Sequence, residues 1–249
     1  MIRIYNENEI EIMRRGGKIL AEIMEGLKKE VRPGVTTNYL NKVAKDLVLS
    51  YGGEPSFLGY DGYPAALCTS VNEEIVHAVP SERELKEGDI LSLDLGIRFE
   101  GYCTDVAITM PIGKVDKKTK KLIDVTEKSL ELGIKQAKAG NHLGDIGSAI
   151  QNYAEKNGFN VIRELVGHGV GKKVHEEPQI PNYGPSAGLG IKLKAGMVLA
   201  LEPMLCVGDW RIKKCEDGFG YKTADNSLSC HFEHTIAITK KGPQILTEL

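Results

Sequence analysis

The sequence lacks an excess of charge of either sign. It contains 32 Lys and Arg against 34 Asp and Glu, which gives a formal net charge of -2. Binding to nucleic acid or to an anionic membrane depends on concentrated positive charge, and this balance offers none. Long apolar runs are also missing, since none approaches the ~18 residues that a membrane-spanning helix needs. We therefore expect no nucleic-acid specificity and no membrane partner.

Cysteine is sparse and shows no pairing pattern. The five cysteines, at positions 68, 103, 206, 215 and 230, are odd in number and include no C-x-x-C pair. Neither a disulfide framework nor a structural zinc ribbon is expected, and the pattern favours a reducing, cytoplasmic location. Residues 1–15 mix acidic and basic side chains and do not follow the basic-then-apolar order of a signal peptide.

The composition is that of an ordinary folded protein. The 249 residues are 41% hydrophobic and 27% charged. This length is ample for a buried core, and no stretch rich in Pro, Gly or Ser divides it. We therefore expect residues 1–249 to form a single domain.

An internal repeat is visible within that domain. Residues 86–94 read K-x-G-x-h-L-x-L followed by an acid, where h is apolar, and residues 194–202 repeat the pattern. The V-H-x-x-P motifs at His77 and His175 and the helical runs that follow Gly34 and Gly140 recur in the same order. Such concordant repeats predict a duplicated unit with pseudo-symmetric halves of approximately 1–115 and 116–249.

Hydrophobic periodicity predicts helices in pairs and strands in blocks. We expect helices over 7–31, from Thr36 or Thr37 to Gly52, over 117–138 and over 143–157. We expect strands over 65–70, 74–79, 89–98, 102–110, 160–166, 197–207 and 228–239. Because these elements do not alternate strictly, they predict an α+β fold with a curved antiparallel sheet covered by helices.

An acidic residue interrupts the apolar strand 90–95. A carboxylate at such a position is costly unless it is paired or binds a metal. A turn centred between Phe99 and Glu100 would place Asp94 directly opposite Asp105, on the same face of a hairpin. Two such charges repel, and a divalent cation between them would remove the conflict. The alternative is a surface hairpin with two solvated acids.

The repeat extends this reasoning to the second half. Glu202 then corresponds to Asp94, and Glu233, within a second apolar strand, corresponds to Asp105. The charge of four carboxylates balances that of two divalent cations and leaves room for a bridging hydroxide. This stoichiometry is typical of a two-metal hydrolase.

Histidines accompany the carboxylates. His168, in the loop Gly167–Gly171, is a candidate nitrogen ligand, and a mostly oxygen set with one imidazole suits Mn, Fe, Co or Zn. The duplicated His77 and His175 are expected to flank the metals and to donate hydrogen bonds to a substrate carbonyl or oxyanion. Of the others, His142 is expected to open a helix in contact with solvent, and His234 to face away from the site.

These residues closely resemble type I methionine aminopeptidase, a metallopeptidase of the pita-bread fold. The resemblance covers nearly the whole chain. The matching stretches are Leu58–Pro64, Ser70–Glu73, the Asp94 and Asp105 hairpin, Gly167–Gly171, His175–Pro178, Leu201–Met204 and Phe232–Thr235.

The resemblance implies a single catalytic domain that removes the initiator methionine from nascent chains whose second residue is small. It places metal ligands at Asp94, Asp105, His168, Glu202 and Glu233. Two divalent ions would bind the substrate's amino group and carbonyl, and a bridging hydroxide would attack the carbonyl. Glu202 would serve as the acid/base, and His77 and His175 would contact the substrate or intermediate.

The resemblance also implies a methionine-binding pocket. It is formed by Phe57, Tyr60, Tyr63, Cys68, Val174 and Phe219, and its soft apolar character suits a thioether. Phe57 replaces a frequent Cys, Val174 a frequent Phe, and Phe219 a frequent Trp. These replacements put the shape of the pocket in question, but not the metal chemistry.

Alternative functions remain open on the sequence alone. Prolidase and aminopeptidase P have the same metal ligands but usually carry a further N-terminal domain, and a non-enzymatic binding protein could have the same fold. The gap between Glu202 and Glu233 is too short for the helical insertion of type II methionine aminopeptidases. Nascent chains imply contact with ribosomes, although no basic tail supports it. A monomer is expected to suffice because one chain supplies the whole site.

Overall fold

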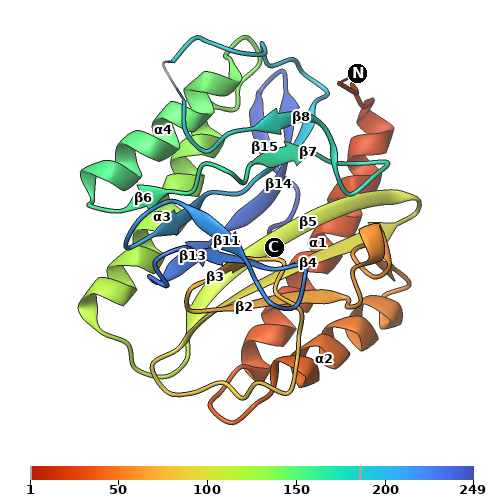
Figure 1. Ribbon diagram of the computed structural model, residues 1–249. Helices are drawn as coiled ribbons and strands as arrows, with labels where there is room; N and C mark the ends of the chain where they lie inside the picture. Colours follow the sequence, from red (N-terminus) through yellow and green to blue (C-terminus); the bar gives the residue numbers. More distant parts are fainter. Residues whose placement is uncertain (1, 185–186) are drawn as a thin grey trace.

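The computed structural model describes residues 2–184 and 187–249. Figure 1 shows a curved sheet with the helix pair α1–α2 beside one part and the pair α3–α4 beside the other. The strand pairings are antiparallel throughout the described chain. The α+β architecture expected from the sequence is therefore confirmed.

The helices lie close to their predicted ranges. They are α1 (Glu7–Glu30), α2 (Thr37–Ser50), α3 (Lys117–Gln136) and α4 (Leu143–Lys156), and a short 3-10 turn covers Tyr60–Gly62. Side-chain caps explain where three of the helices begin. Asn6 and Glu9 form a reciprocal capping box at α1, Thr36 accepts from the Tyr39 amide at α2, and Asp116 accepts from the Thr119 amide at α3. No helix of the described chain is both long enough and apolar enough to cross a membrane.

The main sheet has nine strands within the described residues. Its central order is β1-β4-β5-β14-β9-β7-β8, with β2 paired to β4 and β15 paired to β14. The strands are β1 (Glu54–Pro55), β2 (Leu67–Val71), β4 (Ile90–Phe99), β5 (Tyr102–Pro111), β7 (Gly167–Gly169), β8 (Glu176–Ile180), β9 (Val198–Leu201), β14 (Glu233–Thr239) and β15 (Gly242–Ile245).

Smaller sheets flank the main one. One has the order β13-β10-β6, and another the order β11-β12-β3. Their strands are β3 (Glu74–Val76), β6 (Asn160–Val161), β10 (Met204–Cys206), β11 (Ile212–Lys214), β12 (Tyr221–Thr223) and β13 (Ser229–His231).

The strands of the second half are more interrupted than the sequence predicts. The expected strand 197–207 divides into β9 and β10 around Glu202 and Pro203, and the expected strand 228–239 divides into β13 and β14 at Phe232. Proline cannot donate a ladder hydrogen bond, so it ends the pairing of β9. The expected strand 160–166 is reduced to β6. The breaks place both glutamates at strand ends, where their side chains can turn into a shared cavity.

The register of the β4–β5 hairpin differs from the prediction. Asp94 pairs with Ala107, and Asp105 pairs with Gly96, so the two acids are not directly opposite. The turn is a two-residue loop at Glu100 and Gly101, whose φ angles are 47° and 79°. Positive φ at both positions is typical of a tight hairpin turn, and the turn lies one residue later than predicted. The error moves the pairing by two residues, so both acids stay on one face, as diagonal neighbours.

Separate apolar layers support the two helix pairs. Leu20 of α1 and Leu40 of α2 pack in one buried cluster with β2 and β4 residues such as Leu93. Leu122 of α3 and Ile146 of α4 belong to another, which includes residues of β9 and β14. Ile108 of β5 packs against both clusters. By strand alternation both clusters lie on the face of the sheet opposite Asp94 and Glu233, where they provide a rigid base for the side chains of the other face.

Candidate metal centre and substrate cavity

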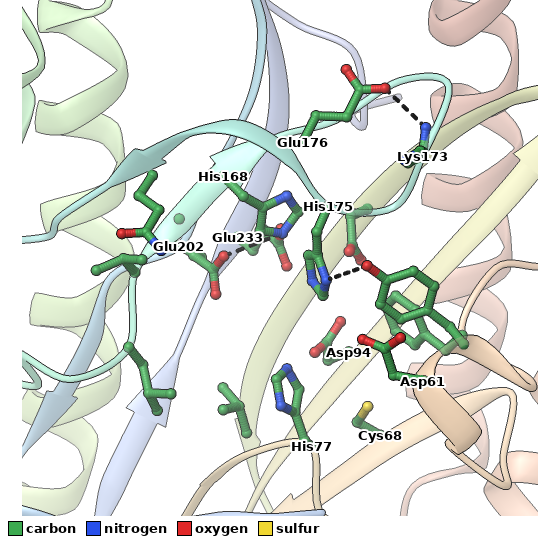
Figure 2. Close-up of a pocket in the computed structure, with 18 of the residues that line it drawn as sticks. Asp61, Cys68, His77, Asp94, His168, Lys173, His175, Glu176, Glu202 and Glu233 are labelled. Atoms are coloured by element: carbon green, nitrogen blue, oxygen red, sulfur yellow. Dashed lines mark hydrogen bonds and ion pairs between the residues drawn. The ribbon is translucent and has the colours of Figure 1, made fainter. Parts of the chain in front are cut away.

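A cavity of about 810 Å³ opens where strands from the two ends of the chain meet. Figure 2 shows carboxylates and imidazoles that project into it from several strands. Of the residues singled out from the sequence, its lining includes Asp94, Asp105, His168, Glu202, Glu233, His77, His175, Phe57, Tyr60, Tyr63, Cys68 and Phe219. Val174 is buried in an apolar cluster with Phe57 and Tyr63 and is not among the lining residues of the described chain.

Asp94 and Asp105 reach the cavity from the β4–β5 hairpin. Both are buried, with 6% and 4% of their surface exposed. Hydrogen bonds fix the backbone of Asp105, whose amide donates to Thr235 Oγ1 and whose carbonyl accepts from the same hydroxyl, each at 2.8 Å. Thr235 is two residues from Glu233 on β14, so this contact ties the first pair of carboxylates to the second half of the chain.

Glu202 and Glu233 reach the cavity from the opposite side. Glu202 follows β9, and its carbonyl accepts from Asn182 Nδ2 at 2.9 Å. Glu233 opens β14 and pairs across the ladder with Ala107, which is also the partner of Asp94. The carboxylates predicted from the repeat therefore lie on neighbouring strands around a common space.

His168 has the tautomer that a metal ligand needs. Its Nδ1 lies 2.9 Å from the Gly169 carbonyl, which can only accept, so Nδ1 carries the proton. Burial lowers the pKa of His168 to about 3, so the ring is neutral and Nε2 has a free lone pair. That nitrogen lies 3.4 Å from Glu202 Oε1. A lone pair directed at a carboxylate is unfavourable unless a cation lies between them.

Burial makes the cluster electrostatically unstable without a cation. It raises the pKa of Asp105 to about 7 and moves the pKa of Asp94, Glu202 and Glu233 well above their usual values. Repulsion between neighbouring carboxylates adds to the effect, and none of the ion pairs of these acids in the described chain involves Lys or Arg. Buried charges without a partner are costly, and bound cations would compensate them.

The unpartnered atoms fit a metal site. Asp94 Oδ1, Asp105 Oδ1 and Glu233 Oε1 are buried and have no hydrogen-bond partner among the described residues. Ligand atoms of Asp105, His168 and Glu233 all lie within 4.8 Å of one another. Hard carboxylate oxygens with one imidazole are typical ligands of divalent Mn, Fe, Co or Zn.

His77 and His175 lie beside the carboxylates. The His175 and His168 rings are 4.3 Å apart and nearly perpendicular, and His175 Nδ1 lies 3.2 Å from the Tyr60 hydroxyl. Burial lowers the pKa of both His77, to about 4, and His175, so both are neutral near pH 7. His77 has φ of 60°, a left-handed conformation that is rare outside glycine and that clusters at functional sites.

An apolar pocket adjoins the polar centre. Tyr63 and Phe219 meet edge to face at 5.5 Å, and the Tyr63 hydroxyl donates toward the carbonyls of Leu67 and Ala78. Phe57 and Cys68 are buried in the same apolar cluster. The aromatic rings and the thiol form a wall without a fixed charge, which suits a soft, unbranched side chain.

Some residues around the site were not singled out in the sequence. Leu165 and Gln179 line the cavity, and Asp61 lies at its edge near His175. His231 is fully buried next to Glu202, and its position at the end of β13, two residues before Glu233, was the available signal. His234, as expected, turns to the other face, where its Nδ1 lies 2.9 Å from Thr247 Oγ1. His142 is the N-cap residue of α4 and is partly exposed.

The comparison with known families decides the class of protein. The model of metallopeptidase family M24 matches residues 11–240. The chain belongs to metallopeptidase family M24. It is 49% identical to a methionine aminopeptidase of Clostridium perfringens, with 99% of each chain covered. The crystal structure of a methionine aminopeptidase from Thermotoga maritima is 46% identical, with both chains fully covered and a TM-score of 0.98.

The resemblance to the pita-bread metallopeptidases is thereby confirmed, and this M24 member is a metal-dependent hydrolase. A prolidase from Pyrococcus horikoshii has the same fold with a TM-score of 0.79, but it is only 22% identical, and the match covers 63% of that chain. Such a likeness concerns the fold alone. The X-Pro peptidase and the non-enzymatic binding protein are not favoured.

Proposed function

We propose that this chain is a methionine aminopeptidase that removes the N-terminal methionine from peptides and nascent proteins whose second residue is small. The observation that carries the proposal is the cluster of Asp105, His168 and Glu233 in a cavity that also has an apolar, aromatic wall. The relatives named as methionine aminopeptidases, matched over the full chain, support the same substrate.

The metal centre is proposed to hold two divalent ions, Mn, Fe, Co or Zn. The proposed ligands are Asp94, Asp105, His168, Glu202 and Glu233. When bound, the ions supply Lewis acidity at the scissile carbonyl and a water nucleophile at neutral pH. Four carboxylates are matched in charge by two dications, which supports this stoichiometry.

Glu202 is the proposed proton carrier. Its carboxylate directly follows β9 and lines the cavity, where a carboxylate can accept a proton and return it. The backbone contact with Asn182 holds it in place. The proton would pass from the attacking water to a Glu202 carboxylate oxygen and then to the leaving amine.

His77 and His175 are the proposed donors to the substrate. With His175 neutral, Nδ1 can accept a hydrogen bond from the Tyr60 hydroxyl, which leaves Nε2–H free to donate. Burial raises the pKa of Tyr60, so its hydroxyl stays protonated for this role. Donors that face a developing oxyanion in a buried site stabilise it more than water does.

The methionine side chain is proposed to enter the apolar pocket. Its proposed contacts are Phe57, Tyr60, Tyr63, Cys68, Val174 and Phe219. Val174 would act from behind the lining, since it is buried in the cluster that backs the pocket.

Residues 1–249 are proposed to work as one catalytic domain, with pseudo-symmetric halves of approximately 1–115 and 116–249, and as a monomer. Ligands from both halves share one cavity, which supports this organisation. We place the protein in the cytoplasm, where its five free cysteines stay reduced and nascent chains on ribosomes are accessible.

An activity screen of Met-X and X-Pro peptides across Mn, Fe, Co and Zn tests the function. We expect release of methionine from Met-Ala and Met-Gly and little from Met-Leu or from X-Pro peptides. Asp94→Asn should be inactive in the same screen, whereas His142→Gln, at the partly exposed start of α4, should match the wild type. Preferential cleavage of X-Pro peptides would overturn the proposal.

A further inference from the structure

We propose that His231 is a positioning residue for Glu202, donating a hydrogen bond from Nε2 to the free oxygen of that carboxylate. The inference rests on the proposed role of Glu202 at the metal centre. His231 ends β13 and is only 1% exposed. Its Nε2 lies 3.6 Å from Glu202 Oε2 and 4.0 Å from Glu233 Oε2.

The Glu202 carboxylate lies between two imidazoles. His168 Nε2 approaches Oε1 at 3.4 Å, and His231 Nε2 approaches Oε2 at 3.6 Å. The Gly169 carbonyl fixes the His168 proton on Nδ1, so that His168 presents a lone pair toward the centre. His231 has no such carbonyl partner, and both of its ring nitrogens lack a hydrogen bond among the described residues.

The carboxylate selects the His231 tautomer. When a bound metal keeps Glu202 ionised, a lone pair on His231 Nε2 would repel Glu202 Oε2. The form with a proton on Nε2 is then favoured, and Oε2, at 3.6 Å, is an acceptor within a few tenths of an ångström of hydrogen-bond distance. A buried N–H without a partner is unfavourable, which adds to this preference. The two imidazoles therefore take complementary roles, one as a ligand and the other as a donor.

The backbone of His231 holds the ring in place. The His231 amide donates to Thr109 Oγ1 at 2.9 Å, and its carbonyl accepts from the same hydroxyl at 2.7 Å. Met204 pairs with His231 across the β10–β13 ladder. These contacts occupy the backbone and leave the imidazole facing the glutamates. Fixing Oε2 restricts rotation of the Glu202 carboxylate and keeps Oε1 beside His168, where a metal would bind.

Mn²⁺ binding to the metal-free protein, measured by calorimetry, tests the inference without reference to turnover. We expect His231→Leu to weaken binding by about 10–100-fold, the usual effect of removing a group that orients a ligand. His231→Gln, which keeps an N–H donor, should restore affinity to within ~3-fold. His234→Gln is the matched control, because that histidine faces Thr247 on the other side of β14. Thermal unfolding verifies that each variant is folded.

Two further measurements separate positioning from other roles. In a Glu202→Ala background, His231→Leu should cause no additional loss of Mn²⁺ affinity, since the group it orients is gone. In the active enzyme, His231→Leu should lower kcat for Met-Ala about 10–100-fold with KM nearly unchanged.

Unaltered Mn²⁺ affinity in His231→Leu would overturn the inference, as would additive losses in the Glu202→Ala background. A direct metal ligand would give a different result. In that case His231→Gln would bind Mn²⁺ as weakly as His231→Leu does, and the Mn²⁺ spin-resonance spectrum of either variant would lose one of two imidazole nitrogen couplings seen in the wild type. That outcome would make the positioning role wrong. If the wild type releases no methionine but Mn²⁺ binding still depends on His231, only the proposed function fails.

Discussion

Asp94 and Asp105 lie on the same face of the β4–β5 hairpin but two residues out of register, with Asp94 opposite Ala107 and Asp105 opposite Gly96. The diagonal places the carboxylates side by side along the strands. Both are buried, so neither solvent nor a neighbouring lysine or arginine compensates their charge within the described chain. This relationship makes the site dependent on a cation.

Removal of metal with a chelator should therefore abolish methionine release from Met-Ala. Restoring Mn, Fe or Co should recover the activity and also raise the midpoint of thermal unfolding, because a ligand that binds only the folded state stabilises it. The measurements are peptide hydrolysis and calorimetry on the same samples. Full activity in metal-free protein would contradict the two-metal mechanism.

The metal-free protein should lose stability as the pH rises from about 6.5 to 8. Burial raises the pKa of Asp105 to about 7 and lifts that of Asp94, Glu202 and Glu233 well above the usual value, so the folded state holds protons that the unfolded chain has released. Stability then falls with pH, on the order of 1 kcal/mol per pH unit for each carboxyl still protonated.

Histidines define the lower end of that window. The folded state also lowers the pKa of His77 to about 4 and of His168 and His231 to about 3. Because the unfolded chain binds protons at these histidines that the folded state does not, the free energy of unfolding rises with pH up to their unfolded pKa of roughly 6.5. Below that pH, this rise opposes the fall caused by the carboxylates. Urea unfolding at pH 6.5 and 8, with and without Mn²⁺, measures the slope. A metal-free protein that is more stable at pH 8 would contradict the electrostatics of the site.

His175→Ala should lower turnover of Met-Ala by ~10²–10⁴-fold while the metal content stays unchanged. The ring contacts His168 and the Tyr60 hydroxyl and is the proposed donor to the reacting carbonyl. Metal analysis of the purified variant distinguishes lost chemistry from lost metal. Wild-type turnover in this variant would remove His175 from the mechanism.

Phe219→Ala should raise KM for Met-Ala about 10-fold and change kcat less, because it removes one aromatic wall of the pocket and the burial that wall provides. The ring meets Tyr63 edge to face at 5.5 Å, so the space it leaves adjoins the proposed methionine side chain. Leu58→Ala, at an exposed position beside the pocket loop, is the control. An equal fall in kcat and kcat/KM with unchanged KM would instead place Phe219 in the chemical step.

The sequence contained enough to predict which carboxylates come together in the candidate site. A carboxylate inside an apolar strand is expensive, and the repeat showed where its counterpart had to lie, so Asp94 and Glu202 could be paired from the amino-acid pattern alone. Asp105 and Glu233 followed from the same reasoning. All four line one cavity with His168.

Details that depend on exact geometry could not be predicted. The register of the hairpin depends on positive φ at Glu100 as well as at Gly101. A glutamate rarely adopts positive φ, so the sequence does not indicate that conformation. The division of the later strands at Pro203 and Phe232 reflects how the glutamates turn inward. His231 was given no role because its position two residues before Glu233 does not indicate that its side chain meets Glu202, a contact made only by tertiary packing.

β14 comes late in the chain, yet it lies in the middle of the main sheet, between β5 and β9. β5 and β9 are therefore joined into one sheet only when residues 233–239 are available to pair with both of them. Contacts of such long sequence separation form late and slowly. A chain still under synthesis has its first pair of acids but no complete cage, so catalytic competence should arise in one step, after these residues have emerged, and no truncated product that lacks them should possess a fraction of it.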